Sequence, residues 1–252
     1  MRKIDKNFAG ISYKIRSLMF YVVIAITMIL LYIILVTIHL FGANYDTKYK
    51  FAVFSSKLFI WILKITCSLG YNIKGLEKIP NEASVFMANH QSFWDNMFMQ
   101  LITPKHSWII KQELLDIPFF GWGLKILEPI AVNRHSSMSV REIIIKGKQK
   151  IANGMSMVIF PESTRLKVNE DRSFKPSGIK LATEASVPIV LIAHNSGLFW
   201  PKGLWIFPGT IQVDIIDVIY PQQFQDKDVR QITENIQKII QERKNSLAVN
   251  KN

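Results

Sequence analysis

The sequence predicts an α/β layered domain that follows an N-terminal pair of membrane helices. Two observations carry this prediction: an uncharged apolar run near the N-terminus, and a later alternation of short apolar runs with amphipathic stretches. The 252 residues suit one domain with a small appendage and are enough to bury a sizeable core. We therefore divide the chain into membrane-anchoring helices over residues 1–70 and a second domain over residues 71–252.

The first apolar run extends from Leu18 to Phe41 and carries no formal charge. About 20 apolar residues cross a bilayer as a helix, so this run is long enough to span. A secretory signal peptide is the alternative, but its apolar core is shorter and a small-x-small cleavage site follows it. The residues Gly42-Ala43-Asn44 match such a site poorly. We expect a retained membrane helix.

A second apolar stretch runs from Phe51 to Leu69 and carries Lys57 and Lys64, with Lys50 one heptad earlier. This spacing puts the three lysines on one helical face, opposite apolar and aromatic residues. A lysine at the bilayer centre costs a few kcal/mol. We therefore expect this helix to lie in the membrane interface rather than to span. The alternative is an amphipathic helix of the soluble core.

The basic residues gather around these two helices. Residues 1–80 hold 11 Lys and Arg against 3 Asp and Glu, whereas residues 81–252 hold 20 against 16. A basic N-terminal segment favours a cytoplasmic N-terminus and attracts anionic lipid headgroups. Nucleic acid is not an expected partner, because no zinc-finger or RNA-recognition pattern is present and the charge lies beside apolar helices. The single cysteine excludes an internal disulfide framework and a Cys-rich zinc site.

The remaining chain alternates between two patterns. Short runs rich in Val and Ile predict strands, at Ser84–Ala88, Trp108–Ile110, Leu127–Val132, Met157–Phe160, Ile189–Ala193 and Ile211–Val218. The amphipathic stretches predict helices, at about Ser92–Leu101, Phe119–Ile126, Ser139–Ala152, Gly178–Glu184 and Asp226–Lys244. Such alternation is typical of an α/β layered domain.

The first candidate for chemistry is the segment that contains His90, Ser92 and Asp95. A predicted strand leads into His90, and Ser92 is a fair N-cap for the helix that follows. On one ideal helix, residues five apart point in different directions. With His90 in the entering loop and Asp95 in the first turn, the two side chains can meet and form a general base whose ring the carboxylate orients. A chance His and Asp at a helix start is the alternative.

The second candidate is the loop Phe160–Arg165, which follows a predicted strand. Loops at this position commonly line sites in α/β sheets. Arg165 offers the planar fork that binds phosphate in a bidentate way. Ser163 is conceivable as a nucleophile, although the glycines of a nucleophile elbow are missing around it. A surface turn with solvated charges is the alternative.

Further basic residues end short apolar runs. Lys111 and Arg134 do so, and together with Arg165 they could converge on one anionic group. Taken one at a time, each is equally consistent with solvated charge. His194 follows the fifth predicted strand, but no acid lies within a few residues of it, so we expect it to be structural or to line a channel.

Four blocks together resemble the 1-acylglycerol-3-phosphate O-acyltransferase family of phospholipid and glycerol acyltransferases. They occur in the family's order and cover about residues 72–218. The blocks are His90-x4-Asp95; Lys111-x-Glu113-Leu114 with Pro118 and Gly121, ending at Arg134; Phe160-Pro161-Glu162-Ser163-Thr164-Arg165; and Val187-Pro188-Ile189-Val190. The resemblance implies a glycerolipid-acyltransferase-like layered domain over residues 71–252, with a central mixed sheet flanked by helices, preceded by an N-terminal membrane helix pair.

Two positions depart from the family pattern. Ser163 stands where the family usually has Gly, and Asn133 stands where it usually has Asp. A side chain at position 163 restricts φ, so we expect the loop there to sit slightly differently. Neither departure removes a residue to which we assign chemistry.

The resemblance also implies a reaction: acyl transfer from acyl-CoA or acyl carrier protein to the free sn-2 hydroxyl of lysophosphatidic acid, giving phosphatidic acid. His90 would take the hydroxyl proton and Asp95 would hold the ring, while backbone N–H groups near the start of the following helix could stabilise the oxyanion. Lys111 and Arg165 match phosphate-binding positions, and Arg134 is a weaker match.

The rest of the resemblance concerns the loop, the ligands and the membrane. Glu162, Ser163 and Thr164 would support the site, with Glu162 structuring its loop. The expected partners are a lysophospholipid acceptor, an acyl-CoA or acyl carrier protein donor, and membrane lipids, with no metal or redox cofactor. Because cytosolic thioesters must reach the site, we expect the second domain to face the cytoplasm at the inner membrane, held by a helical hairpin rather than a single span. A hydrophobic acyl-chain tunnel must also exist, although its location is not predicted.

Three other functions remain open. The acceptor could be another lysophospholipid or an amino-acid lipid. The protein could be a non-catalytic membrane lipid-binding protein, although an intact His90 and Asp95 speak against this. A serine hydrolase that uses Ser163 is the third.

Overall fold

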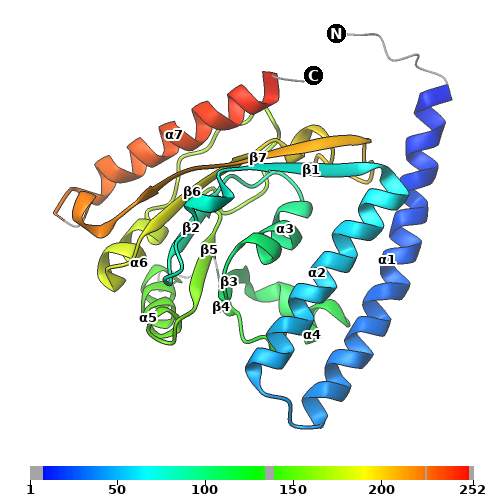
Figure 1. The fold of residues 1–252 in the computed structure, drawn as a ribbon, viewed down its shortest axis with the longest axis horizontal. Coiled ribbons are helices and arrows are strands. Elements are labelled where there is room, and N and C mark those ends of the chain that lie inside the picture. The colour runs from blue at the N-terminus through cyan, green and yellow to red at the C-terminus, as the bar shows by residue number, and fades with distance from the viewer. Residues whose placement is uncertain (1–7, 134–138, 225, 250–252) are drawn as a thin grey trace.

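The chain folds into a seven-stranded sheet with helices on both faces (Figure 1). The structure is a computed structural model that describes residues 8–133, 139–224 and 226–249. The strands are β1 Leu69–Lys74, β2 Val85–Ala88, β3 His106–Lys111, β4 Ile130–Val132, β5 Ser156–Ile159, β6 Ile189–His194 and β7 Gly209–Ile219. The α-helices are α1 Phe8–Leu40, α2 Tyr45–Cys67, α3 Trp94–Ile102, α4 Phe120–Ile126, α5 Ser139–Ala152, α6 Ser177–Ala185 and α7 Val229–Val249.

The sheet is mixed, as predicted. Its strand order is β1-β7-β6-β2-β5-β3-β4, and β6 with β7 is the antiparallel pair while the other neighbours run parallel. Because β2, β3 and β5 are parallel, their carboxyl ends lie at one edge of the sheet. The residues that follow these three strands therefore come together, and they include both chemical segments singled out from the sequence.

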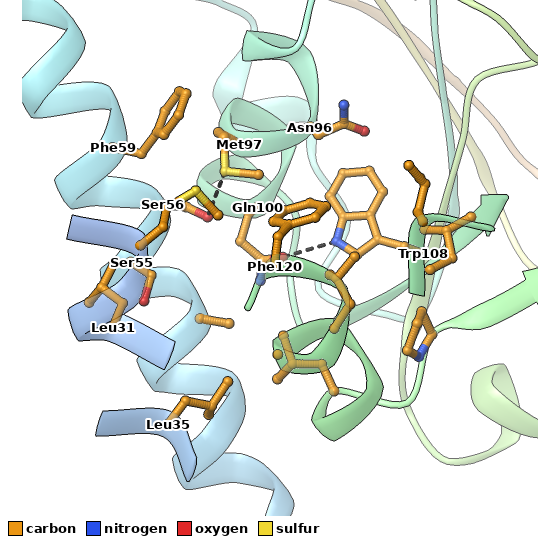
Figure 2. Close-up of a pocket in the computed structure, with 18 of the residues that line it drawn as sticks. Leu31, Leu35, Ser55, Ser56, Phe59, Asn96, Met97, Gln100, Trp108 and Phe120 are labelled. Carbon is orange, nitrogen blue, oxygen red and sulfur yellow. Dashed lines mark hydrogen bonds between the residues drawn. The ribbon is translucent and has the colours of Figure 1, made fainter. Parts of the chain in front are cut away.

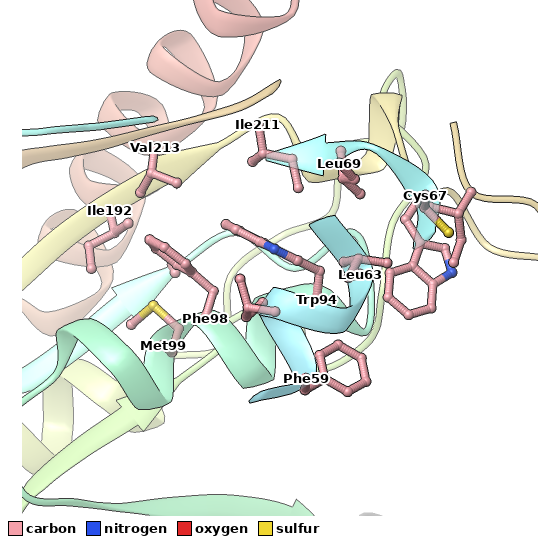
Figure 3. Close-up of a cluster of buried hydrophobic side chains, with 14 of the residues drawn as sticks. Phe59, Leu63, Cys67, Leu69, Trp94, Phe98, Met99, Ile192, Ile211 and Val213 are labelled. Atoms are coloured by element: carbon pink, nitrogen blue, oxygen red, sulfur yellow. The ribbon is translucent and has the colours of Figure 1, made fainter. Parts of the chain in front are cut away.

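Side chains of the central strands alternate between two cores. Phe86 and Ile192 face the core under α2 and α3, whereas Met87 and Leu191 face the core under α5, α6 and α7. This period of two is the geometry of a strand that is buried on both faces. Figure 3 shows part of the first core, where Phe59 and Leu63 of α2 approach Trp94 and Phe98 of α3.

The two N-terminal helices pack side by side in a hairpin (Figure 1). Residues 41–44 connect them, with Gly42 at φ 76° and the Asn44 side chain accepting the Thr47 N–H at 2.9 Å. This cap explains why α2 begins six residues before the predicted start. At the other end Ser68 adopts φ 53° and terminates α2.

The apolar character of α1 matches the first prediction. Residues Ser12–Leu40 are long and apolar enough to cross a membrane by length and composition, and 17% of the most apolar window is buried. The helix α2 does not meet that test within the described part of the chain. Its Lys50, Lys57 and Lys64 are all exposed on one face, next to exposed Phe54 and Trp61. A pair of membrane helices is therefore not shown.

Most predicted elements are present, with three notable differences. The strand β1 was not predicted, because Leu69 ends the preceding apolar run. This strand lies at the edge of the sheet and, among the described strands, pairs only with β7. The helix α7 continues to Val249, five residues beyond its predicted end, with Leu247 buried. The predicted strand Leu127–Val132 is confined to Ile130–Val132, and Glu128 before it has φ 50°.

Candidate active site

His90 and Asp95 meet where β2 leads into α3. His90 lies in the loop and Asp95 in the first turn of the helix, and His90 Nδ1 is 3.0 Å from Asp95 Oδ2. The His90 side chain is 15% exposed, whereas that of Asp95 is fully buried. With Nδ1 directed at the carboxylate, Nε2 is the ring nitrogen left for a substrate proton.

The Asp95 carboxylate collects hydrogen bonds from three further residues. Its Oδ2 accepts the N–H groups of Gln91 at 2.7 Å and Ser92 at 2.9 Å, and its Oδ1 accepts the hydroxyls of Ser92 and Ser196, each at 2.6 Å. Burial by itself raises the pKa of Asp95, but the positive charge of His194 and His90 and the hydrogen bonds from His90 and Ser196 outweigh it and hold the pKa below its usual range. The carboxylate is therefore ionised and fixed in place.

These contacts correct one expectation and narrow a second. Ser92 is not the N-cap, because α3 begins at Trp94 after Phe93 and the Ser92 hydroxyl donates to Asp95 instead. The N–H groups of Gln91 and Ser92 are also engaged by Asp95, so they are not available to an oxyanion. Both differences arise because a buried carboxylate competes for the donors at the helix start.

A second histidine lies behind the carboxylate. His194 Nε2 is 3.7 Å from Asp95 Oδ2, and His194 is 1% exposed. Its backbone N–H donates to Asn89 Oδ1 at 2.9 Å, and its carbonyl accepts Asn89 Nδ2 at 3.0 Å. This clamp joins the end of β6 to the residue before His90. The sequence offered no acid close to His194 along the chain; the acid is 99 positions away.

The loop after β5 supports His90 from the other side. Glu162 Oε2 accepts the His90 N–H at 2.6 Å, and the Leu166 N–H donates to the His90 carbonyl at 2.8 Å. The Phe160 ring stacks on the imidazole with centroids 4.1 Å apart and an interplanar angle of 13°. Burial raises the pKa of Glu162 to about 8. Thr164, the other polar residue assigned to this loop, is half-buried.

Ser163 occupies a conformation that favours glycine. Its φ is 61°, in the left-handed region, so the backbone keeps the shape that a glycine would take despite the Cβ. A side chain in this backbone region adds strain at Ser163.

The structure describes two of the three candidate phosphate ligands, Arg165 and Lys111. Arg165 is exposed and lies with His90 on the wall of a cavity. Lys111 ends β3, and His90 follows β2, two positions along in the sheet. Two strand spacings separate the backbones at these positions by about 10 Å. Its Nζ is 2.8 Å from Glu113 Oε1. Arg134 lies outside the described residues.

An apolar cavity of about 340 Å³ opens beside His90. It lies between α1, α2, α3, α4 and β3, and Figure 2 shows side chains from these elements facing it. The apolar lining includes Ile24, Met28, Leu31, Leu35, Phe59, Phe93, Met97, Trp108, Phe120 and Leu124. No sequence pattern marked it, because its walls come from five elements and look like ordinary core residues.

Comparison with known proteins identifies the family to which the chain belongs. The acyltransferase family model matches residues 70–195. A 1-acyl-sn-glycerol-3-phosphate acyltransferase from Pseudomonas aeruginosa is 37% identical over 174 residues, which cover 68% of each chain. A chloroplastic 1-acyl-sn-glycerol-3-phosphate acyltransferase from Brassica napus is 28% identical over 77% of this chain and 57% of its own length. The chain belongs to the acyltransferase family, as the four motifs predicted.

The fold is likewise confirmed by a solved structure. The crystal structure of the 1-acyl-sn-glycerophosphate acyltransferase PlsC from Thermotoga maritima matches with a TM-score of 0.81, covering 97% of this chain and 100% of that one. The sequence identity is 20%, so this likeness concerns the fold alone.

The strain at Ser163 gives the first prediction. A residue with a Cβ in the left-handed region destabilises the folded state by about 1 kcal/mol, and Ser163→Gly removes this strain. The glycine also stabilises the unfolded state by about 0.5–1 kcal/mol, because it gives the unfolded chain more conformational freedom. We expect chemical unfolding in detergent to show a stability between the native value and about 0.5 kcal/mol above it, with acyl transfer retained. Ser173→Gly, where φ is not positive, is the control and should lose about 0.5–1 kcal/mol. A folded Ser163→Gly protein without activity would instead assign chemistry to the hydroxyl.

The buried Glu162 gives the second prediction. Its folded pKa of about 8 exceeds the ordinary value of 4.5, so between these values the folded chain holds a proton that the unfolded chain has lost. The contribution of Glu162 to stability is complete below about pH 4.5 and declines as the pH rises to about 8, by at most about 1.4 kcal/mol per pH unit. Glu162→Gln keeps an acceptor for the His90 N–H and should flatten this decline in unfolding experiments.

The matched control is Glu242→Gln on an exposed face of α7. It should leave the dependence of unfolding free energy on pH as it is in the native chain. An unchanged slope in Glu162→Gln would show that Glu162 is ionised in the folded state.

Proposed function

We propose that this chain transfers an acyl group from a thioester to the sn-2 hydroxyl of lysophosphatidic acid and so forms phosphatidic acid. The observation that carries the proposal is the buried, ionised Asp95 that holds His90 at one end of an apolar cavity, with Arg165 on the same wall. The names of the similar proteins from Pseudomonas aeruginosa and Brassica napus support this acceptor.

The proposed step needs one base. His90 Nε2 takes the proton from the acceptor hydroxyl while the oxygen attacks the thioester carbonyl. The new C–O bond forms, the C–S bond breaks, and the proton on His90 passes to the departing thiolate. Asp95 keeps the proton on Nδ1 and stabilises the imidazolium that forms in between. Atoms and charges balance without an acyl-enzyme.

The cavity is suited to the donor's acyl chain. Its walls are mostly aliphatic and aromatic, and each buried methylene group of a chain contributes about 0.8 kcal/mol. A chain lying there would place its carbonyl carbon near His90. Acyl-CoA and acyl carrier protein both present such a chain as a thioester, and we propose them as the two donors to compare.

The acceptor phosphate would meet the cations at the carboxyl edge of the sheet. Arg165 is exposed beside His90, and Lys111 lies about 10 Å away across two strand spacings. A phosphate between them would allow the glycerol hydroxyl to reach Nε2. Arg134, which lies outside the described residues, is the third proposed ligand.

The hairpin supports a membrane location for the site. The exposed face of α1 carries Val22, Ile26 and Ile33, and that of α2 combines Trp61 with its lysines. Apolar and basic side chains of this kind suit a lipid interface. Because α2 returns the chain to the end from which α1 starts, we propose that the N-terminus and the catalytic domain share the cytoplasmic side, where thioesters are made.

The third prediction tests the base. We expect native protein in detergent micelles to convert labelled lysophosphatidic acid to phosphatidic acid with palmitoyl-CoA or palmitoyl acyl carrier protein as donor. His90→Ala should lower kcat about 10²–10⁴-fold, because a positioned base contributes that much. His39→Ala, an exposed histidine of α1, is the control and should keep native activity.

Other outcomes would change the account. Activity within tenfold of native in His90→Ala would contradict the base. No product from either donor would contradict lysophosphatidic acid as the acceptor. A panel of other lysophospholipids and amino-acid lipids would then be used to identify the acceptor.

A further inference from the structure

The connection between β6 and β7 lies against the N-terminal half of α1. The Tyr21 hydroxyl donates to the Leu204 carbonyl at 2.8 Å, and the Ser17 hydroxyl accepts the Ile206 N–H at 3.0 Å. These contacts join residues that are 183 and 189 positions apart in the chain. Because α1 lies at the edge of the molecule (Figure 1), the connection extends the surface that this helix presents to its surroundings.

Aromatic and basic side chains hold the same segment on the helix. The Tyr13 ring packs against Trp205 and Phe207, with ring centroids 6.5 Å and 4.8 Å apart. Lys14 Nζ lies 5.5 Å from the centroid of the Trp205 ring. The contacts extend from Tyr13 to Tyr21, which is about two turns of helix. The connection is therefore fixed to α1 and does not hang free beside it.

The side chains that residues 201–205 leave exposed are of the kinds found at a lipid interface. Leu204 is 62% exposed, Lys202 is exposed, and Trp205 is partly exposed. Tryptophan and lysine are common where a membrane-bound protein meets the headgroups, and their long side chains combine an apolar stem with a polar tip. A single exposed leucine is ordinary on a protein surface, so its surroundings decide what it indicates.

These surroundings are the exposed apolar face of α1. Leu18 precedes Tyr21 by one helical turn and Val22 follows it, and both are exposed. They belong to the segment Ser12–Leu40, which is long and apolar enough to cross a membrane. Leu204, held by Tyr21, thus continues an apolar surface whose composition matches lipid.

The backbone contacts also suit this position. Irregular backbone is tolerated beside lipid only where its polar groups are paired or reach water. Side chains of α1 pair the Leu204 carbonyl and the Ile206 N–H from the side on which the helix lies. The loop can therefore rest at the membrane interface with its remaining backbone groups turned to the headgroups and water.

We propose that residues 201–205 form a lipid-contacting loop beside the α1–α2 hairpin, with Leu204 in the apolar part of the membrane interface and Lys202 and Trp205 among the headgroups. The inference rests on the membrane location proposed for the hairpin, but not on the proposed reaction. The same connection carries Ser196, whose hydroxyl donates to Asp95 Oδ1 at 2.6 Å. One segment thus joins the lipid surface to the support of the catalytic base.

The experiment measures whether lipid reaches the loop. Leu204→Cys is labelled with the fluorophore NBD and reconstituted into vesicles of phosphatidylethanolamine and phosphatidylglycerol, with or without doxyl-labelled phosphatidylcholine as a short-range quencher. The native Cys67 is 1% exposed, so the native chain is the blank for labelling. We expect the label at position 204 to lose fluorescence with the quencher, as does a label introduced by Val22→Cys on the exposed face of α1.

The matched control is Leu76→Cys. Leu76 is 50% exposed, but it lies beyond the end of β1 opposite to Gly209, where the connection enters β7. The strand from Leu69 to Lys74 separates these two ends by about 17 Å. A label at position 76 should keep its fluorescence.

Lys202→Cys provides a second position in the loop and replaces position 204 in the test if Leu204→Cys does not fold. Quenching in the loop and at position 22, but not at position 76, is the expected result.

The other outcomes overturn the proposal in distinguishable ways. Quenching at position 22 alone would remove the lipid contact of the loop and leave Leu204 to solvent or to another protein. Equal quenching at position 76 would show that the loop is no more in contact with lipid than the rest of the surface. If positions 22 and 204 both keep their fluorescence, the membrane location of the hairpin fails together with this inference. Acyl transfer in micelles is measured separately and still decides the proposed reaction.

Discussion

The buried Asp95 carboxylate is the constraint on which the site depends. A charge with no exposure is tolerated only when donors replace water. Here the donors come from His90, Gln91 and Ser92 in the loop before α3, and from Ser196 after β6. The carboxylate is stable only when these segments are assembled around it. Folding of the two segments therefore also fixes the orientation of the His90 ring.

The topology supplies that assembly. The parallel strands β2, β3 and β5 end at one edge, where Glu162 and Phe160 grip His90 through its backbone and its ring. The antiparallel partner β7 leads away from β6, and the connection between them, residues 195–208, places Ser196 beside the carboxylate. The helices α1 and α2 close the remaining side and form much of the apolar cavity.

The central strands and the family could be predicted from the sequence, because both depend on patterns of neighbouring residues. The central strands appear as short Val- and Ile-rich runs, and the order of the four motifs indicates the acyltransferase family. Residues that depend on distant partners could not be found in this way. The strand β1 exists by pairing with β7, Ser196 meets an acid 101 positions earlier, and the cavity is shared among five elements. Ser92 illustrates the same point, since a local capping rule gave way to a tertiary hydrogen bond.

The most direct test of the central claim is the tautomer of His90. Nitrogen NMR of protein labelled with ¹⁵N-histidine, with the signals assigned through their loss in His90→Ala, reports which ring nitrogen carries the proton. We expect the neutral ring of native His90 to be protonated at Nδ1, where it donates to Asp95, and Asp95→Asn to weaken or reverse this preference. A native ring protonated mainly at Nε2, or one that is unaffected by Asp95→Asn, would contradict the claim that the buried carboxylate sets the base.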